Sequence, residues 1–289
     1  MSISSLQLDA FNEVAKYLSF SKAAQSLAIT QSALSQRVKN LEVDLAVTLF
    51  IRDTAGIKLT EFGLKLHRYS QMKNSLEDDF LNELRSKNKN EFVGIVRIAG
   101  FSSVLRSVII PALADFLRKN SKIQFEFIKG EIFELPNLLR SGEADFVISD
   151  ERFNKSDIVE ESLGTEEYVV IESLKHQSQA DVFLDHGPAD NATETYFNFQ
   201  AKKPKKYRRV FMGDVYGILD GVSEGLGRAV MSKHLIHKKC AVKMIKGYKK
   251  YEKEVTLHYY NQPFYPAIFT AIKDELLKNC SNYLKSNGV

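Results

Sequence analysis

Six hydrogen-bonding side chains gather on one face of a predicted helix near the start of the chain. They are Gln31, Ser32, Ser35, Gln36, Arg37 and Lys39. Glutamine can make a bidentate pair with adenine and arginine with guanine, while serine reaches either a base or a phosphate. Thr30 precedes them as an N-cap, and the free N–H groups of a helix start suit a phosphate. The pattern predicts a surface that reads the major groove; an ordinary amphipathic surface helix is the alternative.

The elements that must position this face follow from the apolar spacing. The buried stripe of the same helix is predicted to consist of Ala33, Leu34, Val38 and Leu41. Residues 21–28 read as a preceding short helix, in which the small side chains of Ala23 and Ala24 allow close crossing. A further helix is predicted over 6–18 and would pack on these two. Two short helices joined by a tight turn, with a third packed on them, predict a helix-turn-helix.

A predicted hairpin follows these helices. Residues 49–51 form a short apolar run, 53–56 carry turn residues, and 57–59 resume an alternating pattern. The hairpin would be the wing of a winged helix, flanked by Arg52 and Lys58, which could contact phosphates or enter the minor groove. A simple surface hairpin with two solvated cations is the alternative.

A long helix is predicted next, over residues 60–87, with Thr60 as its cap. Its apolar residues fall at heptad positions, with Lys73 at one position of the same seam. The seam residues are Phe62, Leu66, Tyr69, Leu76 and Phe80. A second copy of this helix is the expected partner for the stripe, and packing on the chain's own second domain is the alternative. Residues 86–91 are polar and aperiodic and are predicted to be a hinge.

The remaining residues, about 200, alternate strand and helix. Strands are predicted over 92–99, 122–127 and 144–149, with helices over 103–119 and 132–141 between them. This order predicts an α/β domain with a parallel sheet and right-handed crossovers. Further strands are expected at 168–172, 181–185 and 254–260, and further helices at 214–224 and 267–284.

Composition excludes several classes of protein. The chain has 289 residues, 44% hydrophobic and 26% charged, which fits two or more soluble domains. No apolar run approaches the roughly 20 residues that a membrane helix needs, and the first residues lack a secretory pattern. We therefore expect a cytoplasmic protein with no membrane association. Cys240 and Cys280 are expected to be free thiols, although a disulfide stays open.

The charge of the chain is uneven. A net charge of +4 is too small to indicate nucleic-acid binding by itself. Acidic residues dominate over 126–185 and basic residues over 202–253, most densely in KKPKKYRR at 202–209. This basic run is expected to be a solvated surface.

The first 90 residues resemble the winged helix-turn-helix and linker helix of LysR-type transcriptional regulators. The resemblance rests on a run of matched positions at fixed spacing: Phe11, then SFSKAAQSLAITQSALSQRVKNLE at 19–42, Leu49, Phe50, Arg52, Leu59, Thr60 and Gly63. Ala46 departs from the pattern, which usually has glycine there. The second half also fits, with a strand over 95–101, Pro111, and Gly225-Leu226-Gly227 before Ala229-Val230.

The resemblance implies three parts: a winged helix-turn-helix over 1–59, a linker helix over 60–87 and an effector-binding domain over 88–289. The effector domain would resemble a two-lobed periplasmic binding protein, with one lobe over 92–163 and 259–289 and the other over 164–258. A small molecule would bind between the lobes. The effector-binding residues implied by position are Ser102, Ser103, Ile132, Ser149, Asp150, Asp185 and Gly225. For Ser102 a plain N-cap role is the alternative, and the two roles are compatible.

Two features of the sequence bear on the predicted effector site. Residues 176–199 are short and polar, and the helix that the family usually places in this lobe is not evident. A pocket that is reshaped or lost is therefore the alternative to a working effector cleft, and in that case a partner protein or the abundance of the regulator would carry the signal. The stretch ITQSALSQRVK is similar to the lysine- and arginine-responsive branch of the family, and Asp150 would suit a cationic amino acid.

Rival functions find little support in the residues. No GxSxG, HExxH or cysteine–histidine metal spacing occurs, so neither an enzyme nor a metal or other cofactor is expected. Gly221, Gly225 and Gly227 are expected to stop a helix and allow close packing. His234 and His237 are expected to be surface residues. A periplasmic solute-binding protein is disfavoured by the winged helix and by the missing signal sequence.

The resemblance also implies the mode of action. A dimer would present two recognition helices to the half-sites of an inverted repeat in double-stranded DNA. Dimers of the family pair into tetramers through the effector domains, and a ligand changes the DNA bend by shifting the subunits. RNA polymerase is a candidate partner. Whether transcription is activated or repressed stays open.

Overall fold

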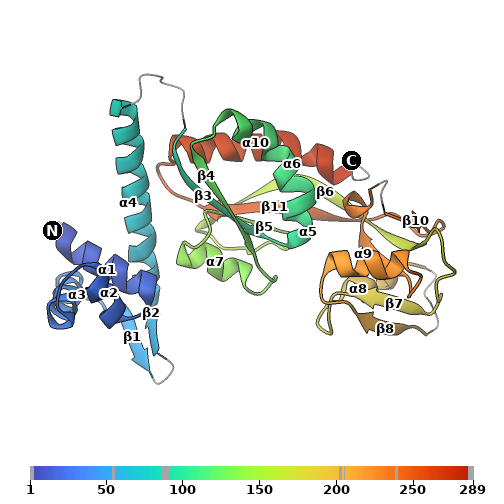
Figure 1. Ribbon diagram of the computed structural model, residues 1–289, viewed down its shortest axis with the longest axis horizontal. Coiled ribbons are helices and arrows are strands. Elements are labelled where there is room, and N and C mark those ends of the chain that lie inside the picture. The colour runs from blue at the N-terminus through green and yellow to red at the C-terminus, as the bar shows by residue number, and fades with distance from the viewer. Residues whose placement is uncertain are drawn as a thin grey trace. The chain divides into compact units, whose positions relative to one another are not determined.

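The structure is a computed structural model that describes residues 3–53, 56–85, 92–201, 204, 206–237 and 240–285. It consists of two compact units (Figure 1). The first comprises Met1–Gly94 with Asn137–Ala144, and the second comprises Ile95–Pro136 with Asp145–Val289. The predicted hinge at 86–91 lies outside the described residues.

Three helices form the core of the first unit: α1 (Ser5–Tyr17), α2 (Phe20–Ser26) and α3 (Gln31–Leu45). Leu34, Val38 and Leu41 are buried as predicted, whereas Ala33 is exposed, so its place in the buried stripe was wrong. The Thr30 hydroxyl accepts the N–H of Ala33 at 3.2 Å and caps α3. Local capping and an apolar stripe thus fix the helix that carries the candidate DNA-reading side chains.

The predicted wing and linker helix are both present. Strands β1 (Phe50–Asp53) and β2 (Gly56–Leu59) pair antiparallel, with Phe50 opposite Leu59. The predicted turn between them falls partly on residues 54–55, outside the described part of the chain. Helix α4 runs over Glu61–Arg85, and the Thr60 hydroxyl accepts the N–H of Gly63 at 3.0 Å, which confirms the predicted cap.

A mixed sheet organises the second unit, in the order β10-β6-β11-β5-β3-β4, with β9 paired to β6. Its strands are β3 (Gly94–Gly100), β4 (Ile123–Lys129), β5 (Phe146–Ser149), β6 (Ile158–Ser173), β9 (Ala229–Ser232), β10 (Val242–Met244) and β11 (Tyr251–Tyr260). Strands β3 and β5 are parallel, as predicted. The prediction of a parallel sheet was wrong for β6, which pairs antiparallel with β11, β9 and β10.

Helices and a small second sheet complete the unit. Strands β7 (Val182–Asp185) and β8 (Arg208–Phe211) form a separate parallel pair. The helical segments are α5 (Ser102–Val104), a π-helical turn η1 (Leu105–Ile109), α6 (Ile110–Lys119), α7 (Leu135–Ser141), α8 (Ala192–Phe199), α9 (Val215–Ser223), the 3-10 turn η2 (Lys233–Leu235) and α10 (Ala267–Lys285). The expectation that residues 176–199 lack a helix was wrong, because α8 lies there.

Aromatic packing explains why α8 forms in a polar segment. Tyr196 and Phe197 are each 2% exposed and pack with Phe183 of β7. Phe197 meets Phe183 edge to face at 5.1 Å, and Tyr196 meets Tyr251 of β11 at 5.9 Å. These partners are distant in sequence, so the helix is stabilised by tertiary contacts that local periodicity does not reveal.

Two long strands connect the parts of the sheet. Residues 158–168 of β6 pair with β11, and the later residues of β6 pair with β9 and β10. β11 also pairs with β5 through Thr256, Leu257 and His258. The strand predicted at 168–172 is therefore the last part of the longer β6, and the strand predicted at 254–260 makes up most of β11 (Figure 1).

Candidate DNA-binding surface and effector site

The polar face of α3 is open to solvent and locally ordered. Thr30, Gln31, Ser32, Gln36 and Lys39 are exposed. The hydroxyls of Thr30 and Ser32 lie 3.0 Å apart, and the Gln36 amide nitrogen Nε2 donates to Oδ1 of Asn40 at 2.7 Å.

The other two predicted contacts on α3, Ser35 and Arg37, are half-buried. The structure therefore places the predicted contacts of α3 on one helix and leaves most of them accessible to a DNA duplex.

Ser21 connects α2 to this face. Its hydroxyl donates to Oε1 of Gln31 at 3.0 Å, so a residue of α2 holds a predicted base-contacting side chain of α3. Sequence reasoning did not identify Ser21 or Asn40 as members of the site. The signal for Asn40 was its place four residues after Gln36 on the same helix. No local signal joins Ser21 to Gln31, because the contact depends on how the two helices cross.

The wing carries two exposed cations, as predicted. The Arg52 guanidinium lies over the ring of Phe20 at 4.0 Å, and Phe20 is itself buried against Phe50 at the start of β1. Lys58 lies on β2 opposite Ile51. A planar guanidinium stacked on an aromatic face loses part of its freedom, which orders Arg52 before any contact is made.

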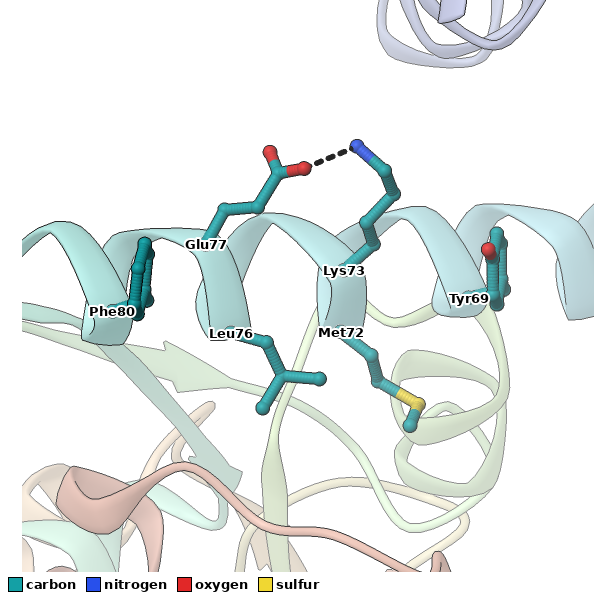
Figure 2. Close-up of a pocket in the computed structure, with 6 residues that line it drawn as sticks. All are labelled: Tyr69, Met72, Lys73, Leu76, Glu77 and Phe80. Carbon is teal, nitrogen blue, oxygen red and sulfur yellow. Dashed lines mark hydrogen bonds and ion pairs between the residues drawn. The ribbon is translucent and has the colours of Figure 1, made fainter. Parts of the chain in front are cut away.

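Helix α4 exposes an apolar stripe. Tyr69, Leu76 and Phe80 are 48%, 44% and 60% exposed, and with Met72 they line a groove (Figure 2). Lys73 and Glu77 border it through an ion pair of 2.7 Å. The predicted seam needs one correction.

Leu66 is only 8% exposed and belongs to the core of its own unit, so it is not part of the open stripe. Met72, which the sequence reading left out, takes part in the stripe instead.

Five of the predicted effector residues follow neighbouring strands. Ser102 and Ser103 come after β3, Ile132 after β4, and Ser149 and Asp150 at the end of β5. Strands β3 and β5 are parallel neighbours, and the Gly130 N–H after β4 bonds the Gly100 carbonyl at 3.2 Å. The sheet therefore brings these residues to one edge. The N-cap of α5 is Phe101, so the plain N-cap role considered for Ser102 was wrong.

The predicted acidic residues are already paired with cations of the chain. Asp150 accepts from Nζ of Lys253 at 2.7 Å. Burial lowers the pKa of Lys253, but the carboxylate of Asp150 outweighs it and the pKa is raised. Ser149 is buried and accepts the N–H of Glu151 at 3.1 Å.

Asp185 and Gly225 lie away from this edge of the large sheet. Asp185 belongs to β7 of the small sheet, is 2% exposed and accepts from Thr193 and Arg209. Burial raises the pKa of Asp185 even though both donors act to lower it. Gly225 has φ +78° just after α9, where an added Cβ would lie 2.6 Å from Cβ of His176. The hydrogen bonds of Asp185 and the backbone conformation and tight packing of Gly225 are enough to explain why these residues are there.

A buried polar network joins helix, turn and long strand. His234, in η2, is 2% exposed, so the expectation that it is a surface residue was wrong. Its Nδ1 lies 2.8 Å from Oγ of Ser107, and its Nε2 lies 2.9 Å from Oε2 of Glu166. Tyr168 donates to the other oxygen of Glu166 at 2.9 Å, and the Ser107 hydroxyl donates to the Ser103 carbonyl at 2.6 Å.

The hydrogen bonds of this network orient the ring of His234. Because the Ser107 hydroxyl donates to Ser103, its oxygen accepts from Nδ1 of His234. Burial raises the pKa of Glu166, but the hydrogen bond and charge of His234 outweigh it and hold the pKa below its usual range. Ser107 and Glu166 together give both ring nitrogens of His234 a hydrogen-bond partner.

Two further tests concern other functions. Among the described residues, no three His, Cys, Asp or Glu side chains come together to hold a metal ion. No helix in the described part of the chain is long and apolar enough to cross a membrane.

Two family descriptions match the chain. The bacterial regulatory helix-turn-helix protein, lysR family, matches residues 6–64, and the LysR substrate binding domain matches residues 89–260. The transcriptional regulator DsdC of Escherichia coli strain K12 is 30% identical over 136 residues, which are 47% of this chain and 42% of DsdC. The chain spans about half the length of the curated relatives it matches.

Solved structures share the fold along nearly the whole chain. ArgP from Mycobacterium tuberculosis is 19% identical, with a TM-score of 0.78 over 99% of this chain and 98% of that one. LysG from Corynebacterium glutamicum, with bound effector Arg, is 18% identical, with a TM-score of 0.74 over 95% and 97%. These findings confirm the predicted architecture of an N-terminal helix-turn-helix with a C-terminal α/β domain. The chain belongs to the LysR family of bacterial regulatory helix-turn-helix proteins, which are transcriptional regulators and not enzymes.

Proposed function

We propose that the chain is a sequence-specific DNA-binding transcriptional regulator whose DNA binding responds to a signal received by its C-terminal domain. The observation that carries this proposal is the exposed polar face of α3, flanked by the ordered cation of the wing. Helix α3 would lie in the major groove, where Gln31, Gln36 and Arg37 meet base edges. Arg52 and Lys58 would contact phosphates or the minor groove.

A second copy of the chain is the proposed partner of α4. The apolar side chains that line the groove on this helix are Tyr69, Met72, Leu76 and Phe80. Their burial against an equal stripe would stabilise a dimer and set the distance between the two recognition helices. Pairing of dimers into tetramers, and contact with RNA polymerase, are further parts of the proposal.

A small molecule is the proposed signal, bound beside Ser102, Ser103 and Ile132. LysG carries a bound Arg, and the same class of cationic effector would need a carboxylate free to pair with it. Here Asp150 is paired with Lys253, and Asp185 with Arg209. This pairing favours a second candidate, in which the cleft is degenerate and a partner protein or the abundance of the regulator carries the signal.

Two measurements test the proposal with the full chain. Fluorescence anisotropy on duplexes enriched from a randomised pool should give binding that weakens steeply with salt. Arg37→Ala should weaken the free energy of DNA binding by about 1–3 kcal/mol if the guanidinium contacts a base. Unchanged binding would show that Arg37 is not part of the base-contacting face. A thermal-shift screen against basic amino acids and small carboxylates tests the effector. A rise in melting temperature that Ser102→Ala abolishes supports the small molecule. No rise with any member of a broad panel supports the degenerate cleft.

A further inference from the structure

The two glutamines on the exposed side of α3 are held by opposite ends of their amides. Gln31 accepts a hydrogen bond at Oε1, from the hydroxyl of Ser21 at 3.0 Å. Gln36 donates a hydrogen bond from Nε2, to Oδ1 of Asn40 at 2.7 Å. An amide group carries an acceptor oxygen on one side and a donor nitrogen on the other. Fixing one side toward a neighbouring residue therefore turns the other side outward.

The contact from Ser21 changes what Gln31 can recognise. The bidentate pair of glutamine with adenine requires the oxygen and the nitrogen to face the same base together. In this structure the oxygen of Gln31 is directed toward α2 by Ser21, so the amino group is the end left for DNA. Amino hydrogens recognise acceptors. In the major groove guanine offers two, N7 and O6, and thymine offers O4, whereas adenine presents its N7 acceptor beside an amino donor.

Both ends of the Ser21–Gln31 bond are held by the local fold. Ser21 is the second residue of α2, whose N-cap Ser19 accepts the N–H of Lys22. Gln31 is the first residue of α3, whose N-cap is Thr30. The buried alanines Ala23 and Ala24 pack α2 into the same core as α3. The hydrogen bond is therefore set by helix packing and does not depend on DNA to form.

DNA contact should strengthen this bond. Ser21 and Gln31 are both exposed in the free chain, where water competes for their hydrogen bonds. A duplex seated on α3 would exclude that water, and hydrogen bonds gain strength as the local dielectric falls. An amide already held in one orientation also loses less rotational freedom on binding.

We propose that Ser21 is a specificity-determining residue, which makes Gln31 present its amino group to a base that carries acceptors. This inference rests on the proposed function, because it needs α3 to lie in the major groove. Ser21 acts through Gln31 and is a positioning residue, so its removal should change which base is preferred at one position of the site.

The experiment is selection from a randomised duplex pool, with the full-length chain and sequencing of the bound fraction. Gln31→Ala identifies the base pair that Gln31 contacts, as the position where preference is lost. At that position the original chain should prefer guanine or thymine by about fivefold or more. Ser21→Ala should lower this preference or shift it toward adenine, and Ser21→Thr, which keeps the hydroxyl, should restore it.

Asn40→Ala is the matched control. It removes an exposed hydrogen bond from the same helix, and it should leave the preference at the Gln31 position unchanged while altering the position that Gln36 contacts.

Four results would overturn the inference. Ser21→Ala that leaves the base preference intact would show that the hydroxyl does not orient Gln31 on DNA. Uniformly weaker binding to all sequences, with an unchanged salt slope because serine carries no charge, would make Ser21 a phosphate contact instead. A preference for adenine in the original chain would show the bidentate pair. Failure of the original chain to enrich any motif would overturn the proposed function together with this inference.

Discussion

Replacing His234 by alanine should destabilise the second unit by about 3–5 kcal/mol, the usual cost of leaving a buried charged group, here the Glu166 carboxylate, without its partner. The cost is large because the site is closed: His234 is 2% exposed and Glu166 is 7% exposed. Alanine removes the bonds of the ring to Ser107 and Glu166 and leaves the carboxylate desolvated. Tyr168 still donates to Glu166, but it supplies no charge.

Thermal unfolding of the full chain measures this loss. For a unit of this size, 1 kcal/mol corresponds to about 2–4 °C, so the transition of the second unit should fall by about 6–20 °C. The transition of the helix-turn-helix unit serves as an internal reference, because His234 lies outside it.

A double-mutant cycle tests the reason for the loss. Glu166→Gln in the His234→Ala background removes the unpaired charge, so the double variant should lose less than the sum of the single losses. Single losses that add within about 0.5 kcal/mol would mean that the two residues are not coupled, and would show that the buried carboxylate of Glu166 does not depend on His234.

Four further predictions follow from single contacts. Arg52→Ala should weaken binding to all DNA sequences alike and reduce the salt slope by about one, measured by anisotropy, whereas a change in base preference would contradict a phosphate contact. Leu76→Glu should remove about 1.5–3 kcal/mol of burial per subunit from a dimer, so sedimentation should report monomers, while Asn74→Asp on the same helix should keep the dimer. Gly225→Ala should lower the free energy of unfolding by more than about 1 kcal/mol in denaturant titrations, because φ is +78° and the new Cβ meets His176. Burial lowers the pKa of His258 in the folded chain, so between pH 6.5 and that lowered pKa the unfolded chain binds a proton that the folded chain does not. The free energy of unfolding should therefore fall as the pH drops through this range, and His258→Gln should flatten this pH dependence.

Much of the first unit could be predicted because its determinants are local. Thr30 and Thr60 cap their helices through bonds that span three residues. Leu34, Val38 and Leu41 recur at the spacing of a buried helix face. The one error on α3 shows the limit of such patterns. Ala33 fits the stripe, but a small side chain at its edge can face solvent at little cost, so spacing alone does not decide its burial.

The second unit was harder because its partners are distant in sequence. Helix α8 is held by Phe183 and Tyr251, which neither its periodicity nor its composition could supply. The antiparallel pairing of β6 and β11 joins residues almost 100 positions apart. Asp150 and Asp185 had the correct residue type for a cationic ligand, but each already pairs through one oxygen with a cation of the chain, Lys253 and Arg209 respectively. A carboxylate in the sequence indicates charge, and only the fold shows whether that charge is balanced.

In α3, the proposed DNA-reading helix, the differences between neighbouring side chains are smaller, and their proposed effect on function is larger. Gln31 and Gln36 have one residue type and lie on one helix, and the pattern alone assigns both to adenine. Their neighbours differ, because Ser21 donates to one amide and Asn40 accepts from the other. The hydroxyl of Ser21 occupies the oxygen of Gln31, which leaves the amino group of Gln31 as a donor to the base. The oxygen of Asn40 occupies the amino group of Gln36, which leaves the oxygen of Gln36 as an acceptor. The residues next to the two glutamines, as much as the glutamines themselves, would then decide the preferred operator.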